Sequence, residues 1–211
     1  MTQIDKRELP DGWRWVRLGD VILEAQPGFA SGKRDPKGVI QIRMNNLDTR
    51  GHILMSEYIR VPADEKTIAR FKLENGDVLF NNTNSTELVG KSALFLGFGE
   101  PVTFSNHFTR LRVISDLLKP QYLAMWLVTQ WQDKVFENLC NRWIGQSAVK
   151  NDKLLTLEIP LPSLSEQHRI AAILAEQIAA VDKARTAAEE QLNAINQLPA
   201  ALMHRAFNGE L

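Results

Sequence analysis

Hydrophobic positions in the last quarter of the chain recur at helical spacing over an unusually long stretch. Across residues 163–197 and just beyond, one row of apolar residues repeats every seven positions, at Leu174, Val181, Ala188, Ile195 and Leu202. A second row fills the intervals, at Ile170, Ile178, Ala184, Leu192 and Leu198. Such a stripe faces another apolar surface, usually another helix. Ser163 followed by Glu166 forms a capping-box pair and predicts where the helix starts. We therefore predict a single helix roughly 50 Å long.

Two interpretations of this helix are open. It packs into the core of its own domain, or it serves as a spacer and dimerisation helix. The rest of the chain has no helical pattern of matching length, which favours a partner helix from another molecule. The predicted dimer interface consists of Ile170, Leu174, Ile178, Val181, Ala188, Leu192 and Ile195. Pro199 lacks a backbone N–H, so we predict a break or kink near Leu198 and a short terminal helix after it.

The preceding 162 residues carry shorter patterns of both kinds. Helical spacing occurs at residues 18–25, 64–71 and 120–139, and strand-like apolar runs occur at 39–42, 53–59, 78–80, 88–96, 108–114 and 154–159. Because strands and helices do not alternate regularly, we predict a mixed α+β body and not a doubly wound sheet. The predicted domains are a globular body, residues 1–162, and a helical segment, residues 163–211.

Composition narrows the class of protein. Lysine plus arginine and aspartate plus glutamate both number 25, so any binding to nucleic acid must depend on a local patch. Cys140 is the only cysteine, which excludes a disulfide within the chain and a cysteine-based zinc site. The first ten residues lack the apolar core of a signal peptide, and the longest apolar run is far below the ~20 residues of a membrane span. We expect a soluble, cytoplasmic protein.

The sequence contains no recognisable catalytic set. A phosphate loop, the Asn-Pro-Pro run of amino-methyltransferases and a serine elbow are all missing, and the four histidines lack metal-binding spacing. We therefore expect no catalytic residues, no metal site and no cofactor in this chain.

Polar side chains suited to DNA gather in four predicted loop regions, at residues 31–46, 81–91, 105–110 and 146–151. Lysine and arginine beside glycine suit phosphate contacts, whereas arginine pairs with guanine and asparagine with adenine through two hydrogen bonds. The candidate residues are Ser31, Lys33, Arg34, Arg43, Asn45, Asn46, Asn81, Asn82, Asn84, Ser85, Lys91, Asn106, His107, Arg110, Gln146, Ser147 and Lys150. Trp143, beside Arg142 in a loop, is a candidate for stacking on a base.

Each of these clusters also has an ordinary structural interpretation. Asparagine-rich runs commonly form turns, a Lys-Arg pair in a loop is commonly solvated, and Asn106 and His107 could be satisfied structural groups. Four clusters at loop positions, in a chain without a catalytic set, favour DNA binding over these alternatives.

Four segments resemble the DNA-specificity (S) subunit of type I restriction–modification systems. They are LPDGWRWVRLGDV at residues 9–21, GDVLFNNTNSTELVGKSALF at 76–95, LEIPLPSLSEQHRIAAIL at 157–174 and LPAALMHRAFNGEL at 198–211. They are similar to the start and middle of its target recognition domain, the junction into its conserved helix, and the end of that helix. A usual S subunit has two recognition domains and two such helices, which pair antiparallel. One of each here implies a half-length subunit or a fragment of a longer one.

The resemblance implies sequence-specific recognition of double-stranded DNA on behalf of other subunits. The implied partners are a methyltransferase (M) subunit that uses S-adenosylmethionine and a restriction (R) subunit that uses ATP and Mg²⁺, with neither cofactor held by this chain. A chain with one recognition domain would form a homodimer, read an interrupted palindrome and direct DNA methylation there. Two other classes stay open: a free-standing DNA-binding regulator that dimerises through a coiled coil, and an enzyme with an unfamiliar site.

Overall fold

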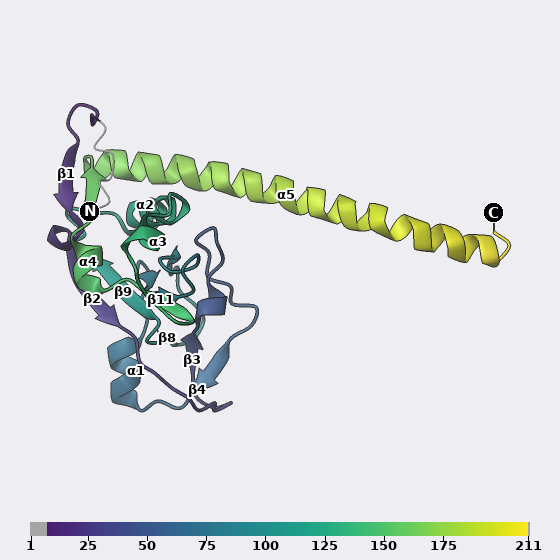
Figure 1. Cartoon of the computed structure of the whole chain (residues 1–211), viewed down its shortest axis with the longest axis horizontal. Coiled ribbons are helices and arrows are strands. Elements are labelled where there is room, and N and C mark those ends of the chain that lie inside the picture. Colours follow the sequence, from purple (N-terminus) through teal and green to yellow (C-terminus); the bar gives the residue numbers. More distant parts are fainter. Residues whose placement is uncertain (1–7, 211) are drawn as a thin grey trace. The chain divides into compact units, whose positions relative to one another are not determined.

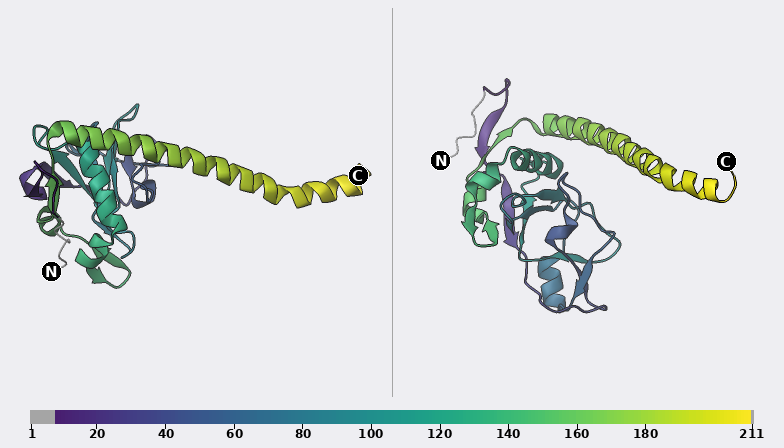
Figure 2. Two further views of the ribbon diagram at one scale, coloured as in Figure 1. Left: turned by 90° about the horizontal axis from the view of Figure 1, so that it is seen from above. Right: turned by 45° about the vertical axis from the view of Figure 1, so that its right-hand side comes forward.

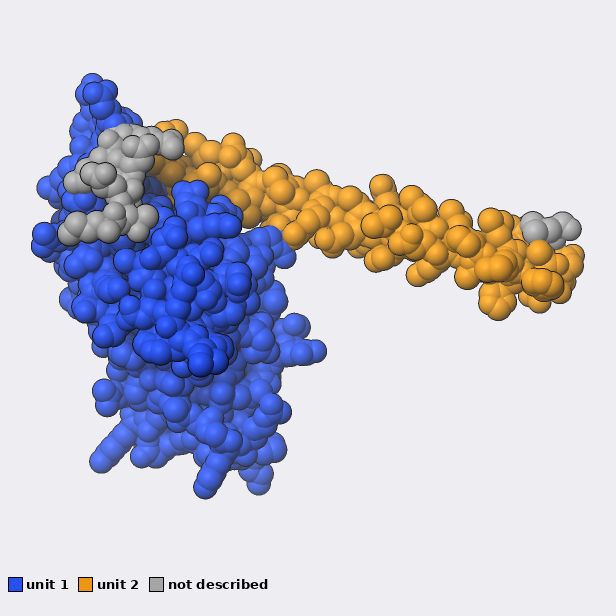
Figure 3. All heavy atoms as spheres, viewed as in Figure 1, with its two compact units in different colours: residues 1–168 blue, residues 169–211 orange. Residues whose placement is uncertain are grey.

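The computed structural model describes residues 8–210 and divides the chain into two compact units, residues 1–168 and residues 169–211 (Figures 1 and 3). The first turn of the long C-terminal helix therefore belongs to unit 1, whereas the sequence placed the boundary between residues 162 and 163. No helix within the described range is both long and apolar enough to cross a membrane.

Unit 1 has the mixed α+β architecture that the sequence predicts. Its largest sheet has the order β2-β9-β5-β7, with all neighbours antiparallel, and contains β2 (Ile22–Pro27), β5 (Val78–Asn81), β7 (Ser92–Leu94) and β9 (Phe108–Val113). A second sheet has the order β4-β3-β8 and contains β3 (Val39–Ile42), β4 (Ile59–Val61) and β8 (Val102–Phe104). In this sheet β3 pairs antiparallel with β4 and parallel with β8.

Two smaller sheets and several short helices complete this unit. The order β10-β11-β6 joins β6 (Thr83–Asn84), β10 (Asn141–Trp143) and β11 (Gln146–Ala148), and β1 (Arg14–Arg17) pairs with β12 (Glu158–Leu161). The helices are α1 (Glu65–Phe71), α2 (Pro120–Gln132), α3 (Val135–Leu139) and α4 (Asn151–Leu155), with 3-10 turns η1 (Leu18–Asp20) and η2 (Met44–Asn46).

The two larger sheets share one hydrophobic core. Ile40 and Ile42 of β3, Leu79 of β5, Phe104 of β8 and Phe108 of β9 are fully buried in one cluster. All four residues of β3 are buried, as expected of a strand that is covered on both faces. Burial of these side chains fixes where β3, β5 and β8 end and where β9 begins.

Several sequence predictions of local structure are wrong. Residues 18–25 form η1 and β2 instead of a helix, because β2 pairs with β9 along its whole length. Only the last residue of the predicted strand at 53–59 lies in a strand, β4. The helix predicted at 120–139 divides into α2 and α3, because Lys134 adopts the left-handed conformation with φ of 58°. Residues 154–159 lie across the end of α4 and the start of β12.

The C-terminal helix α5 (Leu164–Phe207) is one continuous helix (Figure 2). Ser163 Oγ accepts from the backbone N of Glu166 at 3.3 Å, so Ser163 caps the helix as predicted. The helix continues past Pro199, so a break with a separate terminal helix is wrong, and a bend there stays a prediction. Proline removes one backbone hydrogen bond, and the helix formers on both sides preserve the rest.

Gln167 ties the first turn of α5 into unit 1. Its side chain is fully buried. The Nε2 group donates to Leu117 O and to Pro162 O, both at 3.0 Å, and Oε1 accepts from Lys119 N at 2.8 Å. One side chain therefore satisfies three backbone groups that lead into α2 and α5.

We expect Gln167→Leu to lower the free energy of unfolding by about 3 kcal/mol, because it leaves three backbone groups without their partner at similar side-chain volume. Urea denaturation monitored by circular dichroism measures the change. His168→Leu alters the exposed neighbouring residue and should stay within about 0.5 kcal/mol of wild type. Equal stabilities for the two variants would contradict this role of Gln167.

Candidate nucleic-acid interface

The turn between β8 and β9, residues 105–107, is the point where the four polar clusters of the sequence meet. On one side of the turn, Ser105 N donates to Ile42 O at 3.0 Å, directly before Arg43. On the other side, His107 O accepts from Asn82 N at 2.9 Å and from the side chain of Asn81. Residues far apart in sequence are therefore held at one turn.

Strand directions explain this convergence. Because β3 and β8 are parallel and Ile42 pairs with Phe104, both strands end at the same edge. Because β5 and β9 are antiparallel and Asn81 pairs with Phe108, the end of β5 lies beside the start of β9. The loops that leave β3, β5 and β8 consequently emerge together.

The small sheet brings the fourth cluster to the same place. Ser147 of β11 pairs with Asn84 of β6. The backbone N of Val149 donates to Asn82 O at 2.9 Å, and the hydroxyls of Ser147 and Thr86 lie 2.8 Å apart. Polar residues separated by about sixty positions are thus adjacent through β-pairing.

Gly28 allows the loop at residues 28–38 to approach the turn closely. A Cβ atom at Gly28 would lie 2.3 Å from Ser105 O, a distance that side chains do not tolerate. Phe29 N donates to Phe104 O at 3.3 Å, and the guanidinium of Arg43 donates to Ser31 O at 2.7 Å. The Lys33-Arg34 pair therefore follows a segment that is anchored beside the turn.

We define the polar face as the predicted residues in these loops that keep side-chain surface open to solvent. The exposed residues are Lys33, Arg34, Asn45, Asn106, Trp143, Gln146 and Lys150, and the partly exposed ones are Ser31, Arg43, Asn82, Asn84, Ser85 and His107. Amide, guanidinium and ammonium groups dominate this set. They can donate to phosphate and to base edges.

Five of the predicted residues are buried, namely Asn46, Asn81, Lys91, Arg110 and Ser147. Asn46 Nδ2 donates to Leu54 O and Glu57 O at 3.0 and 2.6 Å. Its Oδ1 accepts from Arg43 N at 2.9 Å, so both ends of the amide are used inside the protein. Asn81 is engaged in the same way by His107 O and by the side chain of Asn84.

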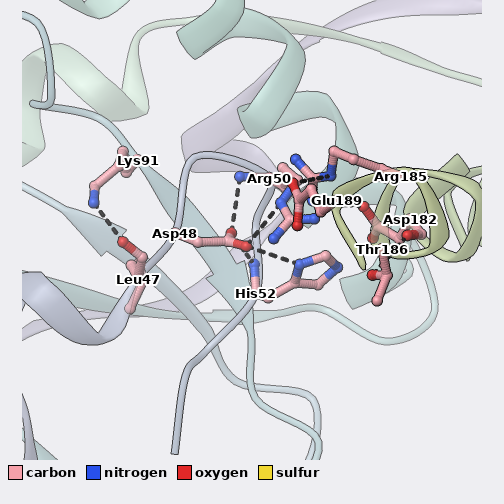
Figure 4. Close-up of polar contacts among 9 residues, drawn as sticks. All are labelled: Leu47, Asp48, Arg50, His52, Lys91, Asp182, Arg185, Thr186 and Glu189. Atoms are coloured by element: carbon pink, nitrogen blue, oxygen red, sulfur yellow. Dashed lines mark hydrogen bonds and ion pairs between the residues drawn. The ribbon is translucent and has the colours of Figure 1, made fainter. Parts of the chain in front are cut away.

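The two buried cations also have internal partners. Lys91 Nζ donates to Leu47 O, and burial lowers the pKa of Lys91 (Figure 4). Arg110 donates to the carboxylate of Glu24 at 2.9 Å and to Lys72 O at 2.9 Å. The internal contacts of these five residues hold the loops in place, and a direct contact of any of them with DNA stays a prediction.

A second fixed group lies in the loop after η2. Asp48 accepts from the side chains of Arg50 and His52 at 3.1 and 3.0 Å and from both of their backbone N–H groups (Figure 4). Although burial opposes ionisation, the hydrogen bonds from His52 and Arg50 hold the pKa of Asp48 below its usual range. The carboxylate organises this loop.

The charge of the turn at residues 105–107 does not depend on protonation of His107 near neutral pH. Burial and the nearby guanidinium of Arg43 lower the pKa of His107, so its ring is neutral at pH 7. Among described residues, Arg43 Nε and Ser105 Oγ are two of the few buried side-chain polar atoms without a hydrogen-bond partner. Within residues 8–210, histidine, cysteine and carboxylates form no metal-binding group.

Sequence reasoning missed one feature of this region. Ile144, next to Trp143 at the end of the β10–β11 hairpin, is fully exposed. The sequence signal for this exposed residue was an apolar, β-branched residue followed by a glycine, between two polar segments.

Known proteins are similar to this chain over most of its length. The family model described as type I restriction modification DNA specificity domain matches residues 10–196. The putative type I restriction enzyme MjaX specificity subunit of Methanocaldococcus jannaschii is 28% identical over 202 residues, which cover 95% of this chain and 46% of that protein.

Two solved structures share the fold. The HsdS subunit from Thermoanaerobacter tengcongensis matches with a TM-score of 0.61 and 25% identity, over 98% of this chain and 48% of that one. A chain from a study of complex assembly and conformational transition of the type I R-M system matches with a TM-score of 0.67 and 24% identity, over 99% and 49%. The chain thus spans about half the length of these relatives.

Asn81 and Asn106 provide a matched pair that separates structural from surface asparagines. We expect Asn81→Ala to lower the free energy of unfolding by about 2 kcal/mol, because two backbone carbonyls and Asn84 lose their partner. Asn106→Ala, at an exposed position, should stay within about 0.5 kcal/mol of wild type. Chemical denaturation measures both, and the reverse order would refute the assignment.

Proposed function

This chain belongs to the type I restriction modification DNA specificity family, and on that premise we propose that it recognises a specific sequence in double-stranded DNA. The observation that carries the proposal is the convergence of three strand ends and the β6–β11 pairing on one turn, which gathers the polar face. Family membership favours this role over the free-standing regulator and the unfamiliar enzyme that the sequence leaves open.

Two kinds of contact follow from the chemistry of the polar face. Lys33, Arg34 and Lys150 are exposed cations on loops and suit phosphate oxygens. Arg43 carries donors, and the exposed amide of Asn45 carries a donor and an acceptor, of the kind that pair with purine edges. The partly exposed amides of Asn82 and Asn84 also have hydrogen-bond partners inside the protein, and their contact with bases stays a prediction. The chain has no net charge, so phosphate affinity is local to this face.

Methyl transfer and cleavage are assigned to partner subunits. A methyltransferase subunit would bind S-adenosylmethionine and extrude the target adenine, and a restriction subunit would use ATP with Mg²⁺. The role of this chain is to place those subunits at the sequence that it reads. Its family supports this division of work, since the matching relatives are specificity subunits of type I enzymes.

Dimerisation through α5 supplies the second recognition domain. The side chains of Val181, Leu192, Ile195 and Leu202 are more than half exposed along one stripe of the helix. Covering such a stripe with the same stripe of a second copy is the simplest closed arrangement. Two identical domains related by a two-fold axis would read the same half-site on opposite strands.

Lys33→Ala tests the phosphate contact. We expect weaker binding to every duplex tested and a decrease of about one in the slope of log affinity against log salt concentration. Fluorescence anisotropy over a salt series measures it. Arg14→Ala, an exposed cation on β1, serves as the control and should leave the slope unchanged. A change in which sequence is bound would mean that Lys33 reads bases.

Acidic substitutions in the apolar stripe of α5 test the homodimer. We expect Leu174→Asp with Val181→Asp to convert a dimer into a monomer in sedimentation velocity, because the dimer would bury unpaired carboxylates. Ala172→Asp with Ala179→Asp adds the same charges at the same spacing on the opposite, exposed face of α5 and should stay dimeric. If wild type is still a monomer at a protein concentration of about 10 μM, well above the micromolar Kd of a weak dimer, homodimerisation is refuted.

Genome-wide mapping of methylated adenines in the host tests the symmetry. A homodimer predicts an interrupted palindrome that disappears when the gene for this chain is deleted. A bipartite site with two different halves would mean that a second, different recognition domain completes the complex.

A further inference from the structure

The end of the β10–β11 hairpin carries two large hydrophobic side chains in solvent. We define the hairpin tip as residues 143–146. Trp143 is 55% exposed and Ile144 is 104% exposed, the highest value for a large hydrophobic side chain among described residues. Both lie within a segment whose other side chains are polar, cationic or small.

Folding does not account for an isoleucine at this position. Trp143 pairs with Gln146, which leaves Ile144 and Gly145 as a two-residue turn, with φ of 85° at Gly145. Gly145 supplies the positive φ of the turn, and the turn geometry does not call for an isoleucine beside it. Ile144 gains no burial in return, because its whole side chain faces water.

The base of the hairpin is held firmly. Arg142 donates to Glu137 O at 3.1 Å, Lys153 Nζ donates to Asn141 Oδ1 at 3.3 Å, and β11 pairs with β6. The tip therefore projects from a fixed support, and that support is the strand pair that carries Asn84 of the polar face.

Charge indicates which partner the tip meets. Between residues 141 and 151 the sequence contains Arg142 and Lys150 and no acidic residue. The hydrophobic tip is flanked by cations and adjoins the donors of the polar face. Duplex DNA has the matching chemistry, because its phosphates are anionic and its bases are stacked inside. Architectural DNA-binding proteins insert isoleucine, leucine or phenylalanine between base steps, and tryptophan stacks on unstacked bases.

We propose that the hairpin tip is a wedge that inserts Ile144 between adjacent base pairs of duplex DNA, while Trp143 stacks on a base exposed by the insertion. This inference rests on the proposed DNA-binding function and adds a local deformation of the duplex to it. The wedge contributes affinity through apolar and stacking contacts, so it does not contribute to the salt dependence of binding.

The experiment compares Ile144→Ala and Trp143→Ala with wild type, and uses Leu96→Ala as the control. Leu96 is also a large, highly exposed hydrophobic residue, at 70%, but it lies beyond β7 and outside the polar face. Thermal unfolding should be the same for all four proteins, because the altered side chains are mostly in solvent. Loss of function in the tip variants would therefore not reflect misfolding.

Two duplexes report on the wedge. Anisotropy of a fluorescein-labelled, mixed-sequence duplex should give a Kd roughly tenfold weaker for each tip variant, with an unchanged salt slope. A duplex of alternating 2-aminopurine and thymine should brighten when wild type or Leu96→Ala binds, because unstacked 2-aminopurine fluoresces more strongly. Neither tip variant should produce this increase.

The outcomes separate the wedge from the proposed function. Wild type that binds both duplexes without any increase in 2-aminopurine emission, or tip variants that bind as tightly as wild type, would overturn the wedge and leave DNA recognition intact. Tip variants with a smaller salt slope would show a phosphate contact and also overturn it. Wild type that binds neither duplex even at low salt, where phosphate contacts alone give non-specific binding, would overturn both proposals.

Discussion

The parallel pairing of β3 with β8 is the constraint on which the candidate interface depends. It places the ends of two buried strands side by side, and the turn that follows β8 then leads into β9 and meets the end of β5. Thr103 strengthens this pairing, since its hydroxyl donates to Ile40 O at 2.8 Å inside the core. Apolar burial thus decides where polar loops emerge.

The interior polar residues complete this arrangement. The amide of Asn46 bonds to backbone groups at both ends, and that of Asn81 bonds to two backbone carbonyls and to the side chain of Asn84, in loops that have no regular ladder of their own. A loop held in this way can present exposed side chains such as Asn45 and Asn106 in fixed positions. Rigid support beneath the contacting side chains is what a protein needs to read one sequence among many.

Local pattern explains which parts of the fold were predictable. The apolar runs that became β3, β5 and β9, the capped start of α1 at Asp64 and the long helix α5 all carry strong periodic or capping signals. The helix prediction for residues 18–25 was wrong because their apolar spacing fits both a helix and a half-buried strand, and pairing with β9 selects the strand.

The candidate site was predictable only in its residue types. Asparagine after a strand can either read a ligand or satisfy nearby carbonyls, and only long-range register distinguishes Asn81 from Asn82. The same limit applies to Lys91 and Arg110, whose burial follows from strands that pair across many intervening residues. The exposed Ile144 escaped notice because a single turn residue carries no periodic signal.

Hydroxyl-radical footprinting of the whole chain, free and bound to duplex DNA, tests the central claim most directly. Met44 directly follows Arg43 and His107 lies in the turn at residues 105–107, whereas Tyr58 and Phe98 contact each other and are not part of the polar face. DNA recognition by the polar face predicts that oxidation of Met44 and His107 decreases on binding and that oxidation of Tyr58 and Phe98 does not change. Protection of Tyr58 and Phe98, with Met44 and His107 still fully reactive, would contradict the account.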